Sequence, residues 1–358
     1  MNRSPLYETH RSAGAAFGQF FDWEMPSSFS SAEEEYRAAK ERAALADRSY
    51  IGRLRMTGED ALDLLDRLST NQVTLLPSGS GLSTVLTTNK GRVVDLVTVY
   101  SRGDYLILLT GPQNREKVIS WIDRYSFGEE ASLEDVTSSL VMLTLYGPRA
   151  SAVLERLVGS SVAELAPHHG VAASHRGIEL YIARDAGLWG EAYNILVPAQ
   201  DAAPIWGSLL DKGEDIEMLL MGTEACEALR IEAGVPACGS ELSEEVNPLE
   251  AGLNSSISFT KGCYVGQEVV ARLNTYKKVK RYLVKLRFPE GPAPQPPAPL
   301  ELEGKEVGVL TSVAALPGDG QSIALGYVRA AHARPGVELA AASGNGRAVG
   351  EIVGLAAD

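Results

Sequence analysis

The chain has 358 residues, of which 45% are hydrophobic and 22% are charged, and its formal net charge is −13. This length allows two or three domains, and the composition is that of a globular protein. The negative charge argues against a protein that coats nucleic acid, because such binding depends on neutralising phosphates. We expect no membrane span, since no apolar run reaches the ~18 residues that one needs. The N-terminal residues also lack the apolar core of a secretory signal.

The cysteines are few and dispersed. Cys226, Cys238 and Cys263 are an odd number, and none of them belongs to a C-x-x-C pair. A disulfide framework or a closed zinc site is therefore not expected, and we predict no bound metal. A cytoplasmic, reducing environment fits this pattern best.

The first part of the chain alternates helical and strand patterns. Ser31 can cap a helix, and Glu33 to Glu35 suit its first turn. Asn89-Lys90-Gly91 supplies turn residues between two strand-like runs, which predicts a hairpin. The predicted elements are a helix over 31–46, a strand over 51–57, a helix over 59–68, strands over 83–88 and 93–100, a strand over 105–109 and a helix over 114–125.

The second part continues in the same style and then changes in composition. Gly234 is the predicted stop of one helix. Six prolines in residues 289–299 predict an extended exposed loop or linker. Short strands with glycine turns follow, which indicates a small barrel or sandwich. The predicted elements are strands over 180–183 and 193–197, helices over 202–210 and 224–233, and strands over 279–287, 306–313, 322–329, 336–340 and 349–353. Hairpins rather than regular βαβ crossovers favour the α+β class.

The most distinctive motif is Lys261-Gly262-Cys263-Tyr264-Val265-Gly266-Gln267-Glu268. Gly262 and Gly266 allow tight bends and close approach to another surface. Lys261 is a nearby cation, which favours the thiolate of Cys263. The alternative is a structural turn with a buried free cysteine, which is the usual fate of this residue type.

This motif resembles K-G-C-Y-x-G-Q-E of the YgfZ family, folate-binding relatives of the glycine-cleavage aminomethyltransferase, or T-protein. The resemblance extends along nearly the whole chain through Trp23-Glu24-Met25-Pro26, Leu145-Tyr146-Gly147-Pro148 and the helix end Leu229–Gly234. It implies a folate-binding region of intertwined α+β subdomains over residues 1–275, followed by a C-terminal β-barrel over 276–358. It also implies a tetrahydrofolate-binding protein that supports iron–sulfur cluster assembly or repair, with client or assembly proteins as partners.

Candidate folate-binding residues follow from the same resemblance. Glu191 ends Gly187-Leu188-Trp189-Gly190-Glu191, which is similar to the family's G-Y-T-G-E loop with its pterin-binding glutamate. A carboxylate can accept the adjacent N–H donors of a pterin, and Trp189 could supply a flat apolar surface. Arg230 matches an arginine that approaches the folate, and Tyr264 is assigned to the same site. The alternatives are an exposed loop acid at Glu191 and a structural ion pair of Arg230 with Glu227 or Glu232.

Cys263 and Asp95 are the candidate catalytic residues. Aminomethyltransferases carry G-G-I-x-D-D-L at the hairpin, whereas this chain reads Lys90-Gly91-Arg92-Val93-Val94-Asp95-Leu96, so the first acid is a valine. Tyr50 replaces the histidine of the family's D-V-S-H-M element. These departures argue against full aminomethyltransferase activity. A true aminomethyltransferase or related demethylase and a non-catalytic folate-binding scaffold stay open as alternatives.

A basic run free of acids follows the motif, from Arg272 to Arg287. It could bind a polyglutamate tail, a phosphate or RNA. The alternative is a solvated face that balances the acidic segment 241–250.

Overall fold

The computed structural model describes residues 1–186, 190–289, 293–316, 320–343 and 346–356. The chain forms two compact units, each built from separate stretches. Unit 1 comprises Met1–Leu62, Leu75–Leu82 and Thr98–Cys226, and unit 2 comprises Asp63–Thr74, Ser83–Val97 and Glu227–Asp358. The domain boundary expected at 275/276 stays a prediction.

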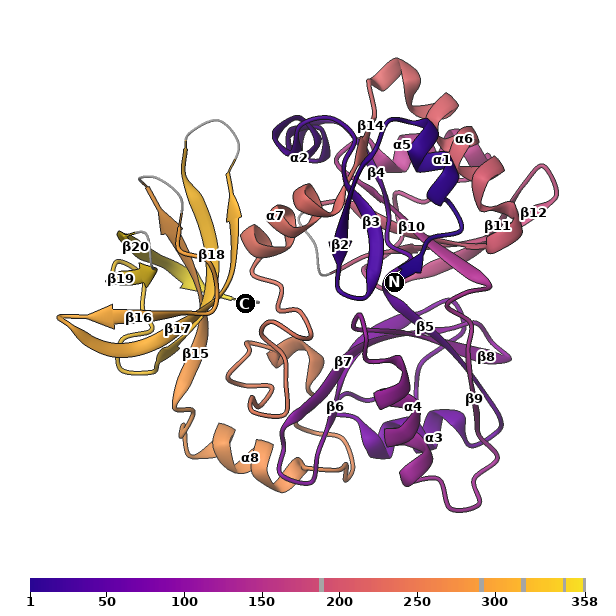
Figure 1. Cartoon of the computed structure of the whole chain (residues 1–358). Coiled ribbons are helices and arrows are strands. Elements are labelled where there is room, and N and C mark those ends of the chain that lie inside the picture. Colours follow the sequence, from indigo (N-terminus) through magenta and orange to yellow (C-terminus); the bar gives the residue numbers. More distant parts are fainter. Residues whose placement is uncertain (187–189, 290–292, 317–319, 344–345, 357–358) are drawn as a thin grey trace. The chain divides into compact units, whose positions relative to one another are not determined.

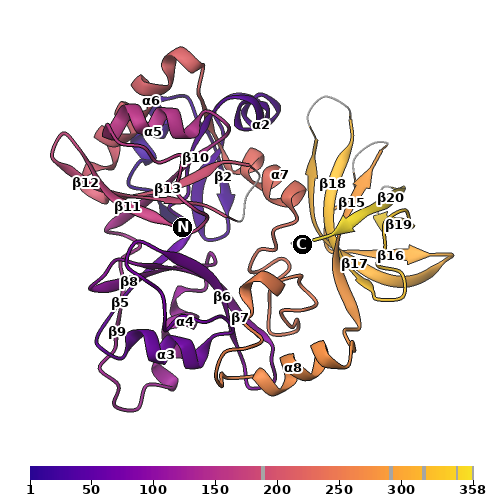
Figure 2. The ribbon, with the colours of Figure 1, turned by 180° about the vertical axis from the view of Figure 1, so that it is seen from behind.

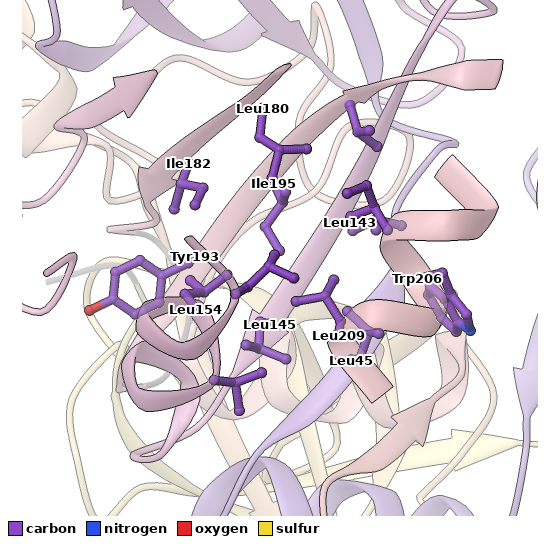
Figure 3. Packing of buried hydrophobic residues seen from close by; sticks show 14 of the residues in the cluster. Leu45, Leu143, Leu145, Leu154, Leu180, Ile182, Tyr193, Ile195, Trp206 and Leu209 are labelled. Carbon is purple, nitrogen blue, oxygen red and sulfur yellow. The ribbon is translucent and has the colours of Figure 1, made fainter. Parts of the chain in front are cut away.

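A mixed six-stranded sheet with the order β11-β12-β13-β10-β4-β14 forms the centre of unit 1. Its strands are β4 (Ala44–Asp47), β10 (Leu140–Tyr146), β11 (Gly170–His175), β12 (Ile178–Arg184), β13 (Ala192–Pro198) and β14 (Leu219–Met221). Helices α5 (Ala150–Val158) and α6 (Ala202–Gly213) lie side by side over it (Figures 1 and 2). Leu143, Ile195 and Trp206 belong to the core between the sheet and these helices (Figure 3).

Strand alternation places polar residues on the other face of this sheet. Thr144 and Asn194 come directly after Leu143 and directly before Ile195, and both are buried. This polar face supplies the candidate site described below.

Unit 1 also contains a small sheet and part of a larger one. A three-stranded sheet has the order β1-β3-β2, and β5, β8 and β9 pair in a second, larger sheet. The elements are β1 (Asn2–Arg3), α1 (Tyr7–Ser12), β2 (Ala16–Phe20), β3 (Trp23–Ser28), α2 (Ala32–Glu41), β5 (Gly52–Thr57), β8 (Tyr105–Thr110), α4 (Arg115–Arg124), β9 (Ser132–Asp135), and the 3-10 turns η1 (Ala199–Asp201) and η2 (Glu214–Ile216).

Helix α2 is shorter than predicted. The Ser31 hydroxyl accepts the backbone N–H of Glu34, so the predicted cap is confirmed. The helix ends at Glu41, because Arg42 adopts φ −135° and ψ −103°, outside the helical region. Residues 44–47 instead form β4, which pairs with β10 on one edge and β14 on the other. A strand held on both edges is buried throughout and lacks the alternation that would have revealed it.

A closed six-stranded barrel is the largest part of unit 2, with the order β15-β18-β17-β16-β19-β20. Its strands are β15 (Arg281–Phe288), β16 (Ala298–Leu302), β17 (Lys305–Ala315), β18 (Ser322–Arg329), β19 (Glu338–Ser343) and β20 (Gly346–Leu355). Leu286, Leu300 and Leu310 are among the residues that fill it. The predicted small barrel is confirmed. Strand β16 was not predicted, because it lies at the end of the proline-rich segment.

The rest of unit 2 is a hairpin, helices and irregular chain. The elements are α3 (Ala61–Leu68), β6 (Gly81–Thr87), β7 (Val93–Ser101), α7 (Thr223–Ala233), η3 (Asn254–Ser256) and α8 (Gln267–Thr275). The predicted hairpin is confirmed, since Thr88 N–H donates to the Arg92 carbonyl at 2.8 Å. β7 then continues into unit 1, where it pairs with β8. Among the described residues, no helix is both long and apolar enough to cross a membrane.

The two glycines of the 261–268 motif differ in what they contribute. Gly266 has φ +86° and precedes α8, and a Cβ there would lie 2.4 Å from the Thr88 carbonyl oxygen. Gly262 has no heavy atom within 4 Å of its would-be Cβ. The sequence predicts close approach to another surface at both glycines. The structure shows it at Gly266, where the motif packs against the hairpin, and not at Gly262.

We predict that Gly266→Ala lowers the free energy of unfolding by at least about 1–2 kcal/mol, since an L-residue in the left-handed region is strained. Gly262→Ala is the matched control and should change it by less than about 0.5 kcal/mol. Urea unfolding of both variants measures this. Equal stability of the two would contradict the contact with the hairpin.

Candidate functional site

The base of the 185–192 loop positions the first candidate residue. Asp185 N–H donates to the Ala192 carbonyl at 2.8 Å, which closes the loop where β12 meets β13. Gly147 N–H donates to the Glu191 carbonyl at 2.8 Å. The Glu191 Oε2 is shielded from solvent and has no hydrogen-bond partner in the part of the chain that the structure describes. Trp189 lies outside the described residues.

A buried amide holds this loop base. The Thr144 hydroxyl donates to Asn194 Oδ1 at 2.8 Å. Asn194 Nδ2 donates to Asp185 Oδ2 at 3.0 Å and lies 3.4 Å from the Tyr100 hydroxyl oxygen. Burial raises the pKa of Tyr100, so this hydroxyl stays protonated at neutral pH. The network therefore fixes the Asp185 carboxylate against the polar face of the sheet.

Arg48 completes this cluster, and the sequence alone did not single it out. It directly follows β4, and its backbone N–H donates to the Met142 carbonyl at 2.9 Å. Its guanidinium lies 3.7 Å from Asp185, and their side chains are 16% and 15% exposed, so a ligand can reach them. Burial alone would lower the pKa of Arg48, but nearby groups, Tyr146 first and Asp185 among them, raise it overall. The guanidinium therefore stays charged.

Asp95 is enclosed in unit 2 rather than open to solvent. Its side chain is fully buried, and the Cys238 thiol donates to its Oδ1 at 2.6 Å. Cys238 belongs to an apolar cluster with Val93 and Leu242. Val94, which stands where the first family acid would be, is also buried. The catalytic role of Asp95 stays a prediction, and in this conformation its carboxylate contacts the chain's own thiol.

Arg230 lies in an ion-pair network. Its guanidinium donates to Glu227 at 2.7 Å, to Glu241 at 3.0 Å and to the Ser312 hydroxyl at 3.0 Å. Burial lowers its pKa, but the two carboxylates outweigh this and raise it overall. These contacts are those of the ion-pair alternative, with Glu241 as an additional partner. They connect α7 to strand β17 of the barrel, and folate binding by Arg230 stays a prediction.

The ammonium of Lys261 is directed at the segment after α3. It donates to the carbonyls of Asp66, Ser69 and Asn71 at 2.6, 3.0 and 2.7 Å, and it lies 3.1 Å from the Asp66 carboxylate. The side chain is 1% exposed. All three N–H donors are thus used within the chain, so Lys261 acts as a tie between the motif and residues 66–71.

The remaining motif residues support this packing. Tyr264 is buried, which raises its pKa to about 12, and its ring centroid lies 5.6 Å from the Lys261 ammonium. Gln267 Nε2 donates to the Gly262 carbonyl at 3.3 Å. Glu268 is exposed in the first turn of α8. A role of Tyr264 in folate binding stays a prediction.

The basic run after the motif is partly used within the chain. Arg281 lies 3.3 Å from the Glu250 carboxylate, whereas Arg272, Lys277, Lys278 and Lys280 are exposed. A ligand for this run stays a prediction.

Cys263 is exposed, whereas Cys226 and Cys238 are buried. We predict that Cys263 reacts with a soluble alkylating reagent at least tenfold faster than the other two in the folded protein, since access controls thiol reactivity. Peptide mapping after timed alkylation measures each rate, and alkylation in denaturant is the control. Equal native rates would contradict the difference in exposure.

Comparison with known proteins assigns the family. Residues 6–261 match the model of the GCVT N-terminal domain, and residues 281–356 match that of the glycine cleavage T-protein C-terminal barrel domain. The aminomethyltransferase T of the glycine cleavage system from Bartonella henselae superposes with a TM-score of 0.88 at 24% identity, over 98% of this chain and 96% of that one. This similarity shows the fold.

Two relatives with higher sequence identity than this structure are both named aminomethyltransferase. An aminomethyltransferase of Desulfitobacterium hafniense is 32% identical over 341 residues, covering 95% of this chain and 93% of the relative. An aminomethyltransferase of Symbiobacterium thermophilum is 33% identical over 351 residues, covering 95% and 92%.

These findings correct the function expected from the motif. None of these relatives is named for iron–sulfur cluster assembly or repair. The comparisons support the aminomethyltransferase alternative instead. The YgfZ branch is not distinguished from the wider family. The motif indicated the wrong function for a physical reason: packing within unit 2 accounts for Lys261 and Gly266. On the evidence of both matching domains and the full-length relatives, the chain belongs to the glycine cleavage T-protein family.

Proposed function

We propose that this protein binds tetrahydrofolate and transfers a one-carbon unit to it as an aminomethyltransferase. The chain's membership of the T-protein family supports this reaction class. Two relatives that match 95% of the chain and are named aminomethyltransferase support it as well. One feature of the molecule supports the substrate independently of these names.

That feature is the carboxylate of Glu191. Buried polar atoms are almost always hydrogen-bonded, and an unpaired one indicates a missing partner. The Glu191 Oε2 is shielded from solvent without a partner among the residues described, while the Gly147 N–H fixes the backbone of Glu191. A pterin carries adjacent N–H donors, which a carboxylate accepts as a charge-assisted pair. Glu191 is therefore the group that we assign to the pterin.

A related demethylase is the second candidate. Val94 and Tyr50 occupy the positions of a family acid and the family histidine, and both side chains are buried. A valine offers no charge to a cationic intermediate, so electrostatic stabilisation must come from other groups. This difference is the observation on which the demethylase candidate rests, and the donor that reacts decides between the two candidates.

Replacing Glu191 tests the substrate. We predict that Glu191→Gln weakens tetrahydrofolate binding by about 1.5–3 kcal/mol, or roughly 10- to 150-fold, because the charge-assisted pair is lost. Glu179→Gln, an exposed acid of β12, is the matched control and should bind like the wild type. Calorimetry measures all three proteins. No binding by the wild type, or equal binding by Glu191→Gln, would reject the assignment.

A transfer assay tests the reaction class. With tetrahydrofolate present, we expect the protein to form methylenetetrahydrofolate from an aminomethyl donor supplied by the other glycine-cleavage components. An N-methylated amino acid, given with the oxidant that its demethylation requires, tests the second candidate. Activity with the methylated donor alone would select the demethylase. If folate binds and neither donor reacts, transfer is ruled out and binding alone is the function.

A further inference from the structure

The charged pair of Arg48 and Asp185 is only loosely closed. The guanidinium of Arg48 is mostly buried, yet within the described parts of the chain it makes no hydrogen bond, and its Nε is shielded from solvent. It lies 3.7 Å from the Asp185 carboxylate, which is too far for a hydrogen bond. A buried charged donor without acceptors is costly, so this arrangement indicates an acceptor supplied by a ligand.

Asp185 is the rigid member of the pair. Asn194 Nδ2 donates to its Oδ2 at 3.0 Å, and the Thr144 hydroxyl donates to the oxygen of the same amide at 2.8 Å. An ionised carboxylate offers about four acceptor positions, so it can accept further N–H donors beside this one. The side chains of Asp185 and Arg48 are 15% and 16% exposed, so one small ligand can contact both charged groups.

The titratable groups around the pair leave its charge balanced. Burial raises the pKa of Tyr100 and of Tyr146, and it lowers the pKa of His168. These three side chains are therefore neutral at neutral pH. A ligand with a single charge would bring an unbalanced charge into a poorly solvated site. A ligand with one positive and one negative group adds no net charge.

We propose that Arg48 and Asp185 bind a small zwitterionic α-amino acid. The guanidinium donates its fork of N–H groups to the carboxylate of the ligand, and the Asp185 carboxylate accepts the N–H groups of the ammonium. Both charged groups of such a ligand are attached to one carbon atom, so they can face side chains that lie 3.7 Å apart.

His168 offers a further acceptor near Asp185. Its backbone N–H donates to the carbonyl of Arg184, the residue before Asp185, at 2.9 Å. Its Nδ1 is shielded from solvent and lacks a hydrogen-bond partner in the part of the chain that the structure describes. In one tautomer of the neutral ring this nitrogen accepts a hydrogen bond, so it suits the ammonium end of the ligand.

The inference goes beyond the proposed function, because it assigns a second ligand and its test needs no folate. An N-methylated amino acid belongs to this ligand class and carries the one-carbon unit that the demethylase candidate consumes. N-methylglycine is therefore the probe.

The experiment measures the binding of N-methylglycine by calorimetry in the absence of folate. Acetate, methylamine and the methyl ester of N-methylglycine each lack one of the two charges and are the ligand controls. The test variants are Arg48→Met and Asp185→Asn. Their matched controls are Arg156→Met and Asp215→Asn, which each disrupt an exposed ion pair of the same unit.

We expect the wild type to bind N-methylglycine with a Kd of about 1 mM or tighter, and each control ligand at least about tenfold more weakly. Arg48→Met and Asp185→Asn should each lose roughly 10- to 150-fold in affinity for N-methylglycine, because each removes a charge-assisted contact. Arg156→Met and Asp215→Asn should bind like the wild type.

The outcomes separate this inference from the proposed function. No binding of N-methylglycine by the wild type overturns the inference and leaves folate binding to be decided by Glu191→Gln. Acetate or methylamine binding as tight as that of N-methylglycine would identify a site for a single charge and overturn it. Unchanged binding in Arg48→Met or in Asp185→Asn would also overturn it. If these variants do not fold, the order of the four ligands on the wild type decides.

Discussion

The hydrogen bonds of Asn194 hold the base of the 185–192 loop, and the proposed chemistry of unit 1 depends on them. The Thr144 hydroxyl donates to the amide oxygen of Asn194, and the amide nitrogen donates to the Asp185 carboxylate. Because these groups are buried, the network resists rearrangement. Glu191 belongs to the same loop, and its Oε2 has no hydrogen-bond partner among the residues that the structure describes. A site with a fixed supporting shell and unpaired recognition groups is arranged for binding rather than for stability.

Unit 2 uses its polar groups differently. Lys261, Arg230 and Asp95 are each buried and each contact partners within the unit. Lys261 ties the motif to residues 66–71, Arg230 ties α7 to the barrel, and Asp95 ties the hairpin to Cys238. The most conspicuous sequence motif is therefore explained in large part by packing. Cys263 is the exception, since its side chain is exposed. The contrast between the units explains why a motif can be specific to a family and yet indicate the wrong function.

The sequence predicted the barrel and the hairpin because their signals are local. Alternating residues and glycine turns mark the strands of 306–353, and Asn89-Lys90-Gly91 marks the hairpin turn. The end of α2 could not be predicted, because β4 is defined by pairing with β10 and β14, which are distant in sequence. Glu191 was proposed from its loop resemblance, and its role stays a prediction. The contact of Arg48 with Asp185 could not be predicted, because it arises from the approach of a strand end to the Asp185 loop. The iron–sulfur function was wrong because an eight-residue motif outweighed similarity along the whole chain.

The central claim is that a pterin binds at the base of the 185–192 loop. A crystal structure of the protein saturated with tetrahydrofolate tests it most directly. The account predicts the 2-amino and ring N–H groups of the pterin within about 3 Å of the Glu191 carboxylate. A complex in which the ring binds elsewhere and Glu191 still lacks a partner would contradict it.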